Sequence, residues 1–177
     1  MSRPRRVWTF GDNVDTDVIT PSQYKHRGKE EYVAHAMEPI EPTFGEEVRP
    51  GDLIVAGRNF GSGSSRETAA IVFAEHGVEA IVAASFARIF YRNAINLGLP
   101  VYVSPAAAAG IEADHEVTID HEAGVIHNGT TGETYEAEPH PPFIRKILEA
   151  GGLAAYRERL HADGDASANA DPDANGE

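Results

Sequence analysis

The sequence predicts an α/β domain in which helices flank a small parallel or mixed sheet, with a short antiparallel β appendage. Apolar runs at 53–56, 79–84 and 101–103 alternate with segments of helical periodicity, an order that is typical of a parallel sheet. From residue 116 the apolar period falls to two, and turn residues separate the short segments, which indicates antiparallel strands. A chain of 177 residues suits one domain with a single core.

The first part of the chain is predicted to contain a strand, a polar loop and a short helix. Residues 6–10 alternate and are rich in β-formers, which indicates the strand. Residues 11–21 carry three aspartates but lack the glycine and the distant glutamate of an EF-hand, so we expect Asx turns rather than a calcium site. A short helix is expected over 30–37, before a linker punctuated by prolines.

A glycine-rich loop follows the apolar run at 53–56, and residues 57–67 read G-R-N-F-G-S-G-S-S-R-E. Its glycines allow the backbone to approach a ligand closely. Ser64 and Glu67 have the S-x-x-E spacing of a capping box, which predicts a helix that begins at Ser64 with its free N–H groups pointing into the loop. Arg66 adds a planar guanidinium, a fork that can donate two parallel hydrogen bonds to one anion. The loop is therefore predicted to bind a carboxylate or a phosphate.

Three familiar motifs do not fit this loop. It lacks the Gly-Lys-Ser/Thr ending of a P-loop, and Arg66 occupies the third-glycine position of a dinucleotide fingerprint, so neither ATP nor NAD is supported. No serine here has glycines two places before and after it, which argues against the nucleophile elbow of an esterase. From the residues alone, a structural loop in which Ser64 only caps a helix is an equal alternative.

Residues 86–98 are predicted to form a second helix that ends at Gly98. Its apolar stripe is expected to be buried and contains Phe86, Ile89, Phe90, Ala94 and Leu97. Arg88 and Arg92 lie four residues apart, so they share one face of the helix and repel each other slightly. Each should seek an external anion or an acidic group, and we favour contact with another subunit over arginines that simply point into water.

The last third of the chain is predicted to hold three short strands, a final helix and a tail. The strands lie between 116 and 137, and the helix spans 143–160 with an interruption at Gly151 and Gly152. Residues 161–177 are acidic and poor in large apolar residues, which predicts a disordered tail after a domain that spans 1–160. His115, His121 and His127 lie near turns without ligand spacing, so exposed histidines are expected rather than a metal site.

Charge and hydropathy exclude several partners. The formal net charge is −13, so nucleic acid and anionic membranes are poor partners. Lysine accounts for only three of the 15 basic residues, and an acidic, lysine-poor surface predicts a salt-rich cytoplasm, the setting of a halophile. The sequence shows neither a long apolar segment nor a hydrophobic signal region, which predicts a cytoplasmic protein.

The chain contains no cysteine. It therefore supplies no disulfide, no catalytic thiol and no thiolate ligand for an iron–sulfur cluster. If such a cluster takes part in the function, another chain holds it.

Three separated motifs, at 12–21, 57–67 and 85–100, resemble the small subunits of 3-isopropylmalate dehydratase, and the resemblance covers roughly residues 7–160. It implies an aconitase-type swivelling domain and a partner large subunit that carries a [4Fe–4S] cluster. It also implies a hydro-lyase of leucine biosynthesis. That enzyme converts 2-isopropylmalate into 3-isopropylmalate in two steps. Water is lost to give an alkene, and water is then added back with the hydroxyl on the adjacent carbon.

The resemblance also implies the roles of individual residues. Ser64 would be the base, Ser65 and Arg66 would bind the substrate carboxylate, and Asp17 and Thr20 would face the active site. Arg66 supplies part of the positive surroundings that a basic serine hydroxyl requires.

The segment after Tyr24 leaves the substrate open. It concentrates positive charge, and in the family it meets the far end of the substrate. Arg27 or Lys29 could hold a second, distal carboxylate, so a homoaconitase or another tricarboxylate hydro-lyase is the alternative. An alternative of another class is a non-catalytic module that only binds a carboxylate at a helix terminus.

Overall fold

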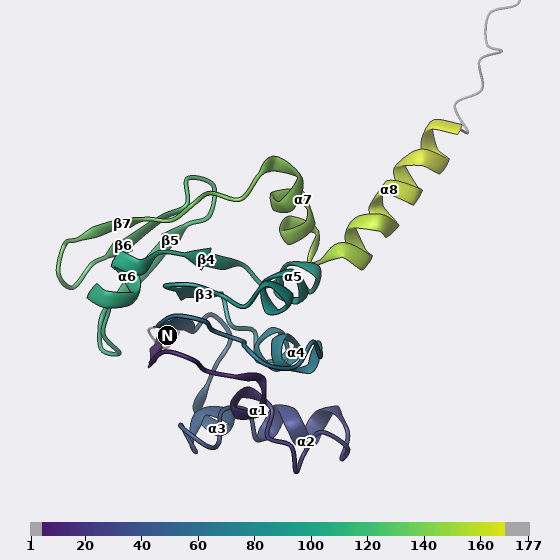
Figure 1. The fold of residues 1–177 in the computed structure, drawn as a ribbon. Helices are drawn as coiled ribbons and strands as arrows, with labels where there is room; N and C mark the ends of the chain where they lie inside the picture. The colour runs from purple at the N-terminus through teal and green to yellow at the C-terminus, as the bar shows by residue number, and fades with distance from the viewer. Residues whose placement is uncertain (1–4, 169–177) are drawn as a thin grey trace, which may run out of the picture.

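The computed structural model describes residues 5–168 and shows two separate sheets (Figure 1). The first is a four-stranded parallel sheet in the order β1-β2-β3-β4, and the second is a three-stranded antiparallel sheet in the order β5-β6-β7. The strands are β1 (Val7–Phe10), β2 (Leu53–Ala56), β3 (Ala80–Ala83), β4 (Val101–Val103), β5 (Val117–Asp120), β6 (Val125–Asn128) and β7 (Thr134–Glu136). The predicted fold class is confirmed, with a wholly parallel main sheet.

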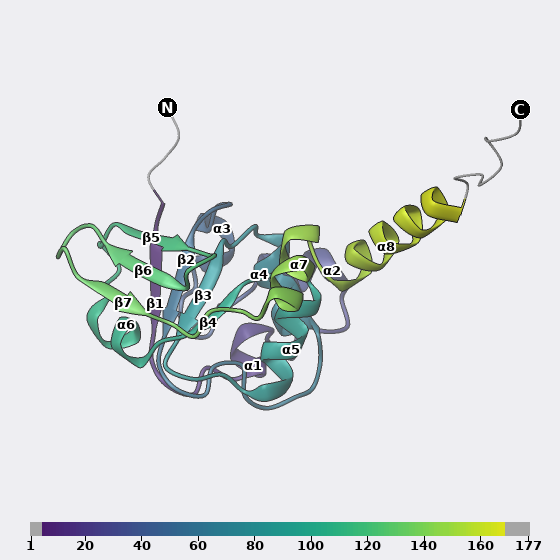
Figure 2. The same ribbon diagram turned by 90° about the horizontal axis from the view of Figure 1, so that it is seen from above.

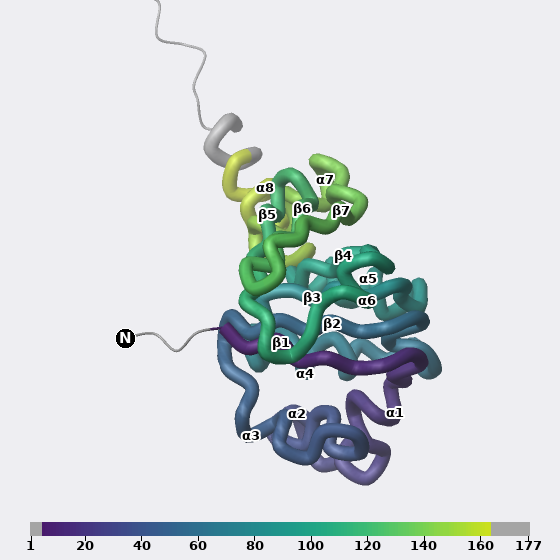
Figure 3. Tube along the Cα trace, turned by 90° about the vertical axis from the view of Figure 1, so that its left-hand side faces the viewer, coloured from purple at the N-terminus to yellow at the C-terminus, as the bar shows by residue number. Residues whose placement is uncertain are grey.

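The helices are α1 (Thr16–Ile19), α2 (Lys29–Ala34), α3 (Phe44–Glu47), α4 (Thr68–Glu75), α5 (Arg88–Asn96), α6 (Pro105–Gly110), α7 (Pro142–Ala150) and α8 (Leu153–Ala168). Helices α1–α3 gather beside the β1 edge of the parallel sheet (Figures 1 and 3). Helix α8 extends away from the rest of the molecule (Figures 1 and 2). No helix within residues 5–168 is long and apolar enough to cross a membrane.

The parallel sheet is covered on both faces, which explains why its central strands are continuously apolar. Side chains of a strand alternate between the two faces. Ile54 and Ile81 therefore join the core under the helices, which includes residues of α4 and α5. Leu53 and Val82 join a second core with residues of α6 and the antiparallel sheet. Strands β2 and β3 are buried along their whole length.

After strand β4, two features of the helices differ from the prediction. Helix α6 was not foreseen, although Ser104 caps it by accepting a hydrogen bond from the backbone N–H of Ala107 at 3.4 Å, and Pro105 starts it. The final helix is divided at Gly151 and Gly152, as predicted, and both have positive φ. However, α8 continues to Ala168, so the tail expected from residue 161 does not begin there; its remainder, 169–177, lies outside the described residues.

The prediction for Ile89 was wrong. It was expected in the buried stripe of α5, yet 47% of its surface is exposed. Phe90, Ala94 and Ile95 supply the buried face instead. One position around a helix corresponds to about 100°, so Ile89 falls just outside the face that packs on the sheet.

Candidate functional site

The candidate site lies where β1 and β2 end. The loop after β1 and the glycine loop after β2 meet there, because carboxyl ends of neighbouring parallel strands share one edge of the sheet. Three backbone hydrogen bonds of 2.8 Å join the loops, from Asn13 N to Arg58 O, from Gly61 N to Val14 O and from Thr16 N to Ser62 O. A Cβ atom at position 57 would lie 2.1 Å from Asp12 Oδ1, so this approach requires a glycine.

The prediction of a capping box at Ser64 was wrong. Helix α4 begins at Thr68, and Glu67 at its N-cap makes no side-chain cap hydrogen bond. The backbone N–H of Ser64 instead donates to Thr16 Oγ1 at 3.0 Å, which ties Ser64 to the neighbouring loop and keeps the chain out of the helix. Ser64 Oγ accepts a hydrogen bond from the backbone N–H of Arg66 at 3.3 Å. The serine is thus held by two loops and is partly exposed.

The two arginines of the glycine loop differ in their partners. Arg58 is bound to Asp12, with Nη2 2.9 Å and Nε 3.2 Å from Oδ2. Arg66 is exposed, and its guanidinium makes no hydrogen bond or ion pair with residues 5–168. Arg66 is therefore the cation of this loop that can take an external anion in its planar fork.

Asp17 is exposed beside this loop, on α1. Its carboxylate accepts hydrogen bonds from Lys25 Nζ and, at 3.4 Å, from Ser22 Oγ. The hydrogen bond from Lys25 and the charge of Lys25 lower the pKa of Asp17, and the charge of Arg66 adds a smaller effect in the same direction. Asp17 is therefore ionised at neutral pH.

Thr20, unlike Asp17, is fully buried. Its Oγ1 has no hydrogen-bond partner among the described residues. The structure places this hydroxyl beneath the surface of the site, so Thr20 does not reach a ligand in this conformation.

The basic segment after Tyr24 is not gathered around Arg66. Lys29 pairs with Glu75, the last residue of α4, at 2.9 Å. The start of α4 adjoins the glycine loop, and at about 1.5 Å per residue its far end lies about 10 Å away. The Arg27 guanidinium is exposed, with its Cζ 5.8 Å from the centre of the Tyr24 ring. The structure therefore places Lys29 away from the site and leaves Arg27 accessible.

Sequence reasoning missed the residues that position the loop. Thr16 is buried and holds the Ser64 N–H, and Asn93 on α5 donates through Nδ2 to Ser65 O at 3.4 Å. Ser85 Oγ accepts the N–H of Asn59 at 2.8 Å. All three lie in the two other motifs of the sequence, at 12–21 and 85–100. The presence of these residues in the two motifs could have pointed to them. However, a sequence does not show which side chain forms a hydrogen bond with which loop.

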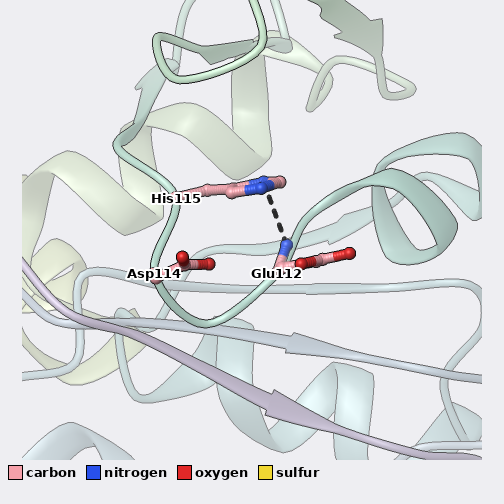
Figure 4. Close-up of side chains that lie close together, drawn as sticks. All are labelled: Glu112, Asp114 and His115. Carbon is pink, nitrogen blue, oxygen red and sulfur yellow. Dashed lines mark hydrogen bonds between the residues drawn. The ribbon is translucent and has the colours of Figure 1, made fainter.

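Away from this site, two carboxylates and a histidine lie close together on the segment between α6 and β5 (Figure 4). Glu112, Asp114 and His115 offer ligand atoms within 4.8 Å of one another. His115 Nδ1 already accepts the backbone N–H of Glu112 at 3.1 Å. Both carboxylates are exposed, and an exposed acidic group of this kind is common without a metal ion.

Within residues 5–168, a larger and a smaller cavity flank the parallel sheet. The larger, of about 730 Å³, lies at the amino ends of β3 and β4 and is lined by residues such as Pro100, His140 and Leu148. The smaller, of about 430 Å³, lies beside the glycine loop and is lined by Ser85, Phe86, Arg88, Tyr91, Arg92 and Val103. The candidate residues therefore lie at the opposite end of the sheet from the larger cavity.

Comparisons with known proteins identify the family of this chain. Residues 12–105 match the Aconitase C-terminal domain family. The chain is 54% identical to the 3-isopropylmalate dehydratase small subunit of Moorella thermoacetica, over 85% of this chain and 92% of that protein. It is 52% identical to the methanogen homoaconitase small subunit of Methanothermobacter thermautotrophicus, over 85% and 88% of the two chains.

A solved structure gives the same result. The crystal structure of 3-isopropylmalate dehydratase from Methanocaldococcus jannaschii superposes with a TM-score of 0.85 at 40% identity, and the match covers 92% of this chain and 97% of that one. The chain therefore belongs to the family of 3-isopropylmalate dehydratase small subunits, which share the aconitase C-terminal domain.

Proposed function

We propose that this chain is the small subunit of a two-chain hydro-lyase that converts 2-isopropylmalate into 3-isopropylmalate in leucine biosynthesis. The names of the relatives support this activity. The observation that carries it is that one exposed loop holds both the Ser64 hydroxyl and Arg66, an arginine whose guanidinium has no partner among residues 5–168. A cation in this position is free to bind an external anion next to the serine hydroxyl.

In this proposal Ser64 removes the proton from the substrate C–H group. A serine hydroxyl is a weak base, so the oxyanion must be stabilised. The Arg66 N–H already donates to Ser64 Oγ, and the Arg66 side chain adds positive charge to the loop. The Arg66 guanidinium also holds a substrate carboxylate through two hydrogen bonds, with Ser65 beside it.

Asp17 accepts a hydrogen bond at the other side of the substrate. It is exposed next to the loop, and its lowered pKa keeps it ionised at neutral pH, as an acceptor requires. Thr20 and Lys29 have no direct role in this proposal, since one is buried and the other pairs with Glu75.

The large subunit holds the [4Fe–4S] cluster in this proposal. Such clusters are held by thiolates, and this chain has no cysteine, so its residues do not fit the cluster. The carboxylates and histidine at 112–115 are ligands of another kind. When bound in the partner, the cluster supplies a Lewis acid for the substrate hydroxyl.

A homoaconitase small subunit is the second candidate, because one relative carries that name and the segment 25–29 is basic. The structure weakens this alternative. Lys25 is bound to Asp17 and Lys29 to Glu75, so within residues 25–29 Arg27 is the exposed arginine or lysine left for a distal carboxylate. An isopropyl group needs an apolar contact at that position, and a tricarboxylate needs a cation.

A substrate comparison tests the proposal. The chain would be reconstituted with its large subunit under anaerobic conditions, and the complex assayed with isopropylmalate, homocitrate and citrate at equal concentration. We expect kcat/KM for isopropylmalate to exceed the others by at least about 100-fold, as for a pocket that leaves a distal carboxylate unpaired. Turnover of homocitrate with none of isopropylmalate would replace this proposal with the second candidate. No turnover of any of them by a cluster-loaded complex would contradict both.

A further inference from the structure

One face of α5 carries two arginines and an isoleucine. Arg88 and Arg92 are exposed, and Ile89 is 47% exposed. At about 100° per residue these three positions fall on one side of the helix, opposite the buried Phe90 and Ala94. Val103, at the end of β4, is 39% exposed and also lines the smaller cavity together with both arginines. We call Arg88, Ile89, Arg92 and Val103 the α5 surface.

The α5 surface adjoins the candidate site. On the same helix, Asn93 Nδ2 donates to Ser65 O at 3.4 Å. The cavity that Arg88, Arg92 and Val103 line is bounded on another side by Ser85, whose hydroxyl holds the glycine loop at Asn59. The α5 surface therefore lies next to the loop of Ser64 and Arg66, within reach of a protein that closes over that loop.

The charges of the α5 surface have no partner in the described part of the chain. Neither Arg88 nor Arg92 makes a hydrogen bond or an ion pair with residues 5–168. They lie four residues apart on a helix, so they repel each other. The chain as a whole has a formal net charge of −13, so two neighbouring arginines without partners among residues 5–168 form a small positive patch on an acidic chain. Arginine beside apolar groups is typical of protein interfaces, where its fork binds carboxylates.

We propose that the α5 surface is the docking surface for the large subunit, which presents carboxylates to Arg88 and Arg92 and an apolar side chain to Ile89. This inference rests on the proposed function, because the partner reaches this surface only if it closes over Ser64. The arginines then fix the register in which the two chains meet, and they favour rapid association. They take no part in binding the substrate.

The test is the affinity of the two chains, measured by calorimetry at low salt with the intact large subunit. The variant R88E/R92E reverses both charges. The matched control R157E/R159E makes the same change on α8, where both arginines are exposed and have no partner among the described residues. We expect R88E/R92E to bind at least about 100-fold more weakly and the control to stay within about twofold of wild type. Both should melt like wild type, because neither loses a hydrogen bond or an ion pair with residues 5–168.

The outcomes separate the docking surface from the function. Equal affinity of R88E/R92E and wild type, or equal weakening by R157E/R159E, contradicts the docking surface and leaves the proposed function standing. Unchanged affinity with lower turnover of R88E/R92E at saturating large subunit also contradicts it, because the arginines would then act on the substrate. Ser64→Ala should bind the large subunit like wild type. Full turnover by that variant would contradict the proposed function and leave the binding result intact.

Discussion

The two ends of strand β2 hold polar groups that are used in opposite ways. At the amino end Asp52 is buried, and its carboxylate accepts hydrogen bonds from Arg6 N at 3.0 Å, Trp8 Nε1 at 3.2 Å and Arg49 N at 3.0 Å. At the carboxyl end Arg66 is exposed and has no partner among residues 5–168. A buried charge must be satisfied inside the fold, whereas an exposed one is available to a ligand. The comparison predicts that substitutions at the amino end, such as at Asp52, lower stability, whereas substitutions at the carboxyl end, such as at Arg66, lower turnover.

The largest effect is expected from Ser64→Ala. Turnover in the reconstituted complex should fall by about 10³-fold, because the base is lost. The melting temperature should change little, since Ser64 does not cap α4 and its hydroxyl accepts one weak hydrogen bond at 3.3 Å. Steady-state kinetics and thermal unfolding of the same preparations provide the two measurements. If Ser64→Ala had a lower melting temperature but wild-type turnover per folded molecule, Ser64 would be a structural residue and not the base.

Asp52→Ala should have the next largest effect, on stability. Three donors would lose a charged acceptor inside the protein, so the free energy of unfolding should fall by about 3 kcal/mol. Turnover per folded molecule should be unchanged. Urea unfolding at neutral pH measures the loss, with Asp12→Ala as the matched control, because Asp12 is an exposed aspartate at the other end of the sheet. Equal losses for the two variants would show that burial does not decide the role of the aspartate.

Arg66→Lys should reduce kcat/KM by about 10-fold to 100-fold. Lysine keeps the charge but replaces the planar fork with a single ammonium, so the two-point grip on a carboxylate is lost. Arg58→Lys is the control, because Arg58 already binds Asp12, and it should stay within about threefold of wild type. Wild-type kcat/KM for Arg66→Lys would mean that the fork does not bind the substrate.

Lys29→Ala is expected to have the smallest effect, below about twofold in kcat/KM. Lys29 makes an exposed ion pair with Glu75 at the far end of α4, and exposed pairs contribute little. Arg27→Ala is the comparison variant, because Arg27 lies in the same segment and remains accessible. A difference in kcat/KM between the two variants shows which of the two side chains reaches the substrate. A tenfold rise in KM for Lys29→Ala would show that the segment rearranges when the substrate binds.

Much of the fold could be predicted because it depends on local patterns. The apolar run at 53–56 became a fully buried strand, and the change of period after residue 116 became the antiparallel sheet. Such patterns report burial and strand pairing directly. The glycine loop and its arginine could also be found, because their residue types are unusual together.

The remaining features depend on contacts between distant segments. Ser64 fits a capping box in sequence, but Thr16 binds its N–H, so the helix starts later. Lys29 lies in a basic segment, yet its partner Glu75 is far away in the chain. Ile89 fits the periodic stripe of its helix but lies beyond the width that the sheet covers. In each case a partner in space decides what the local pattern leaves open.

The central claim is that the Ser64 hydroxyl removes a proton from the substrate. The most direct test is the rate at which the reconstituted complex exchanges the substrate C–H hydrogen for deuterium from the solvent, followed by NMR. The wild-type complex should exchange this hydrogen during turnover, and Ser64→Ala should slow the exchange by about 10³-fold while binding the large subunit as tightly as wild type. Exchange at the wild-type rate in Ser64→Ala would contradict the claim.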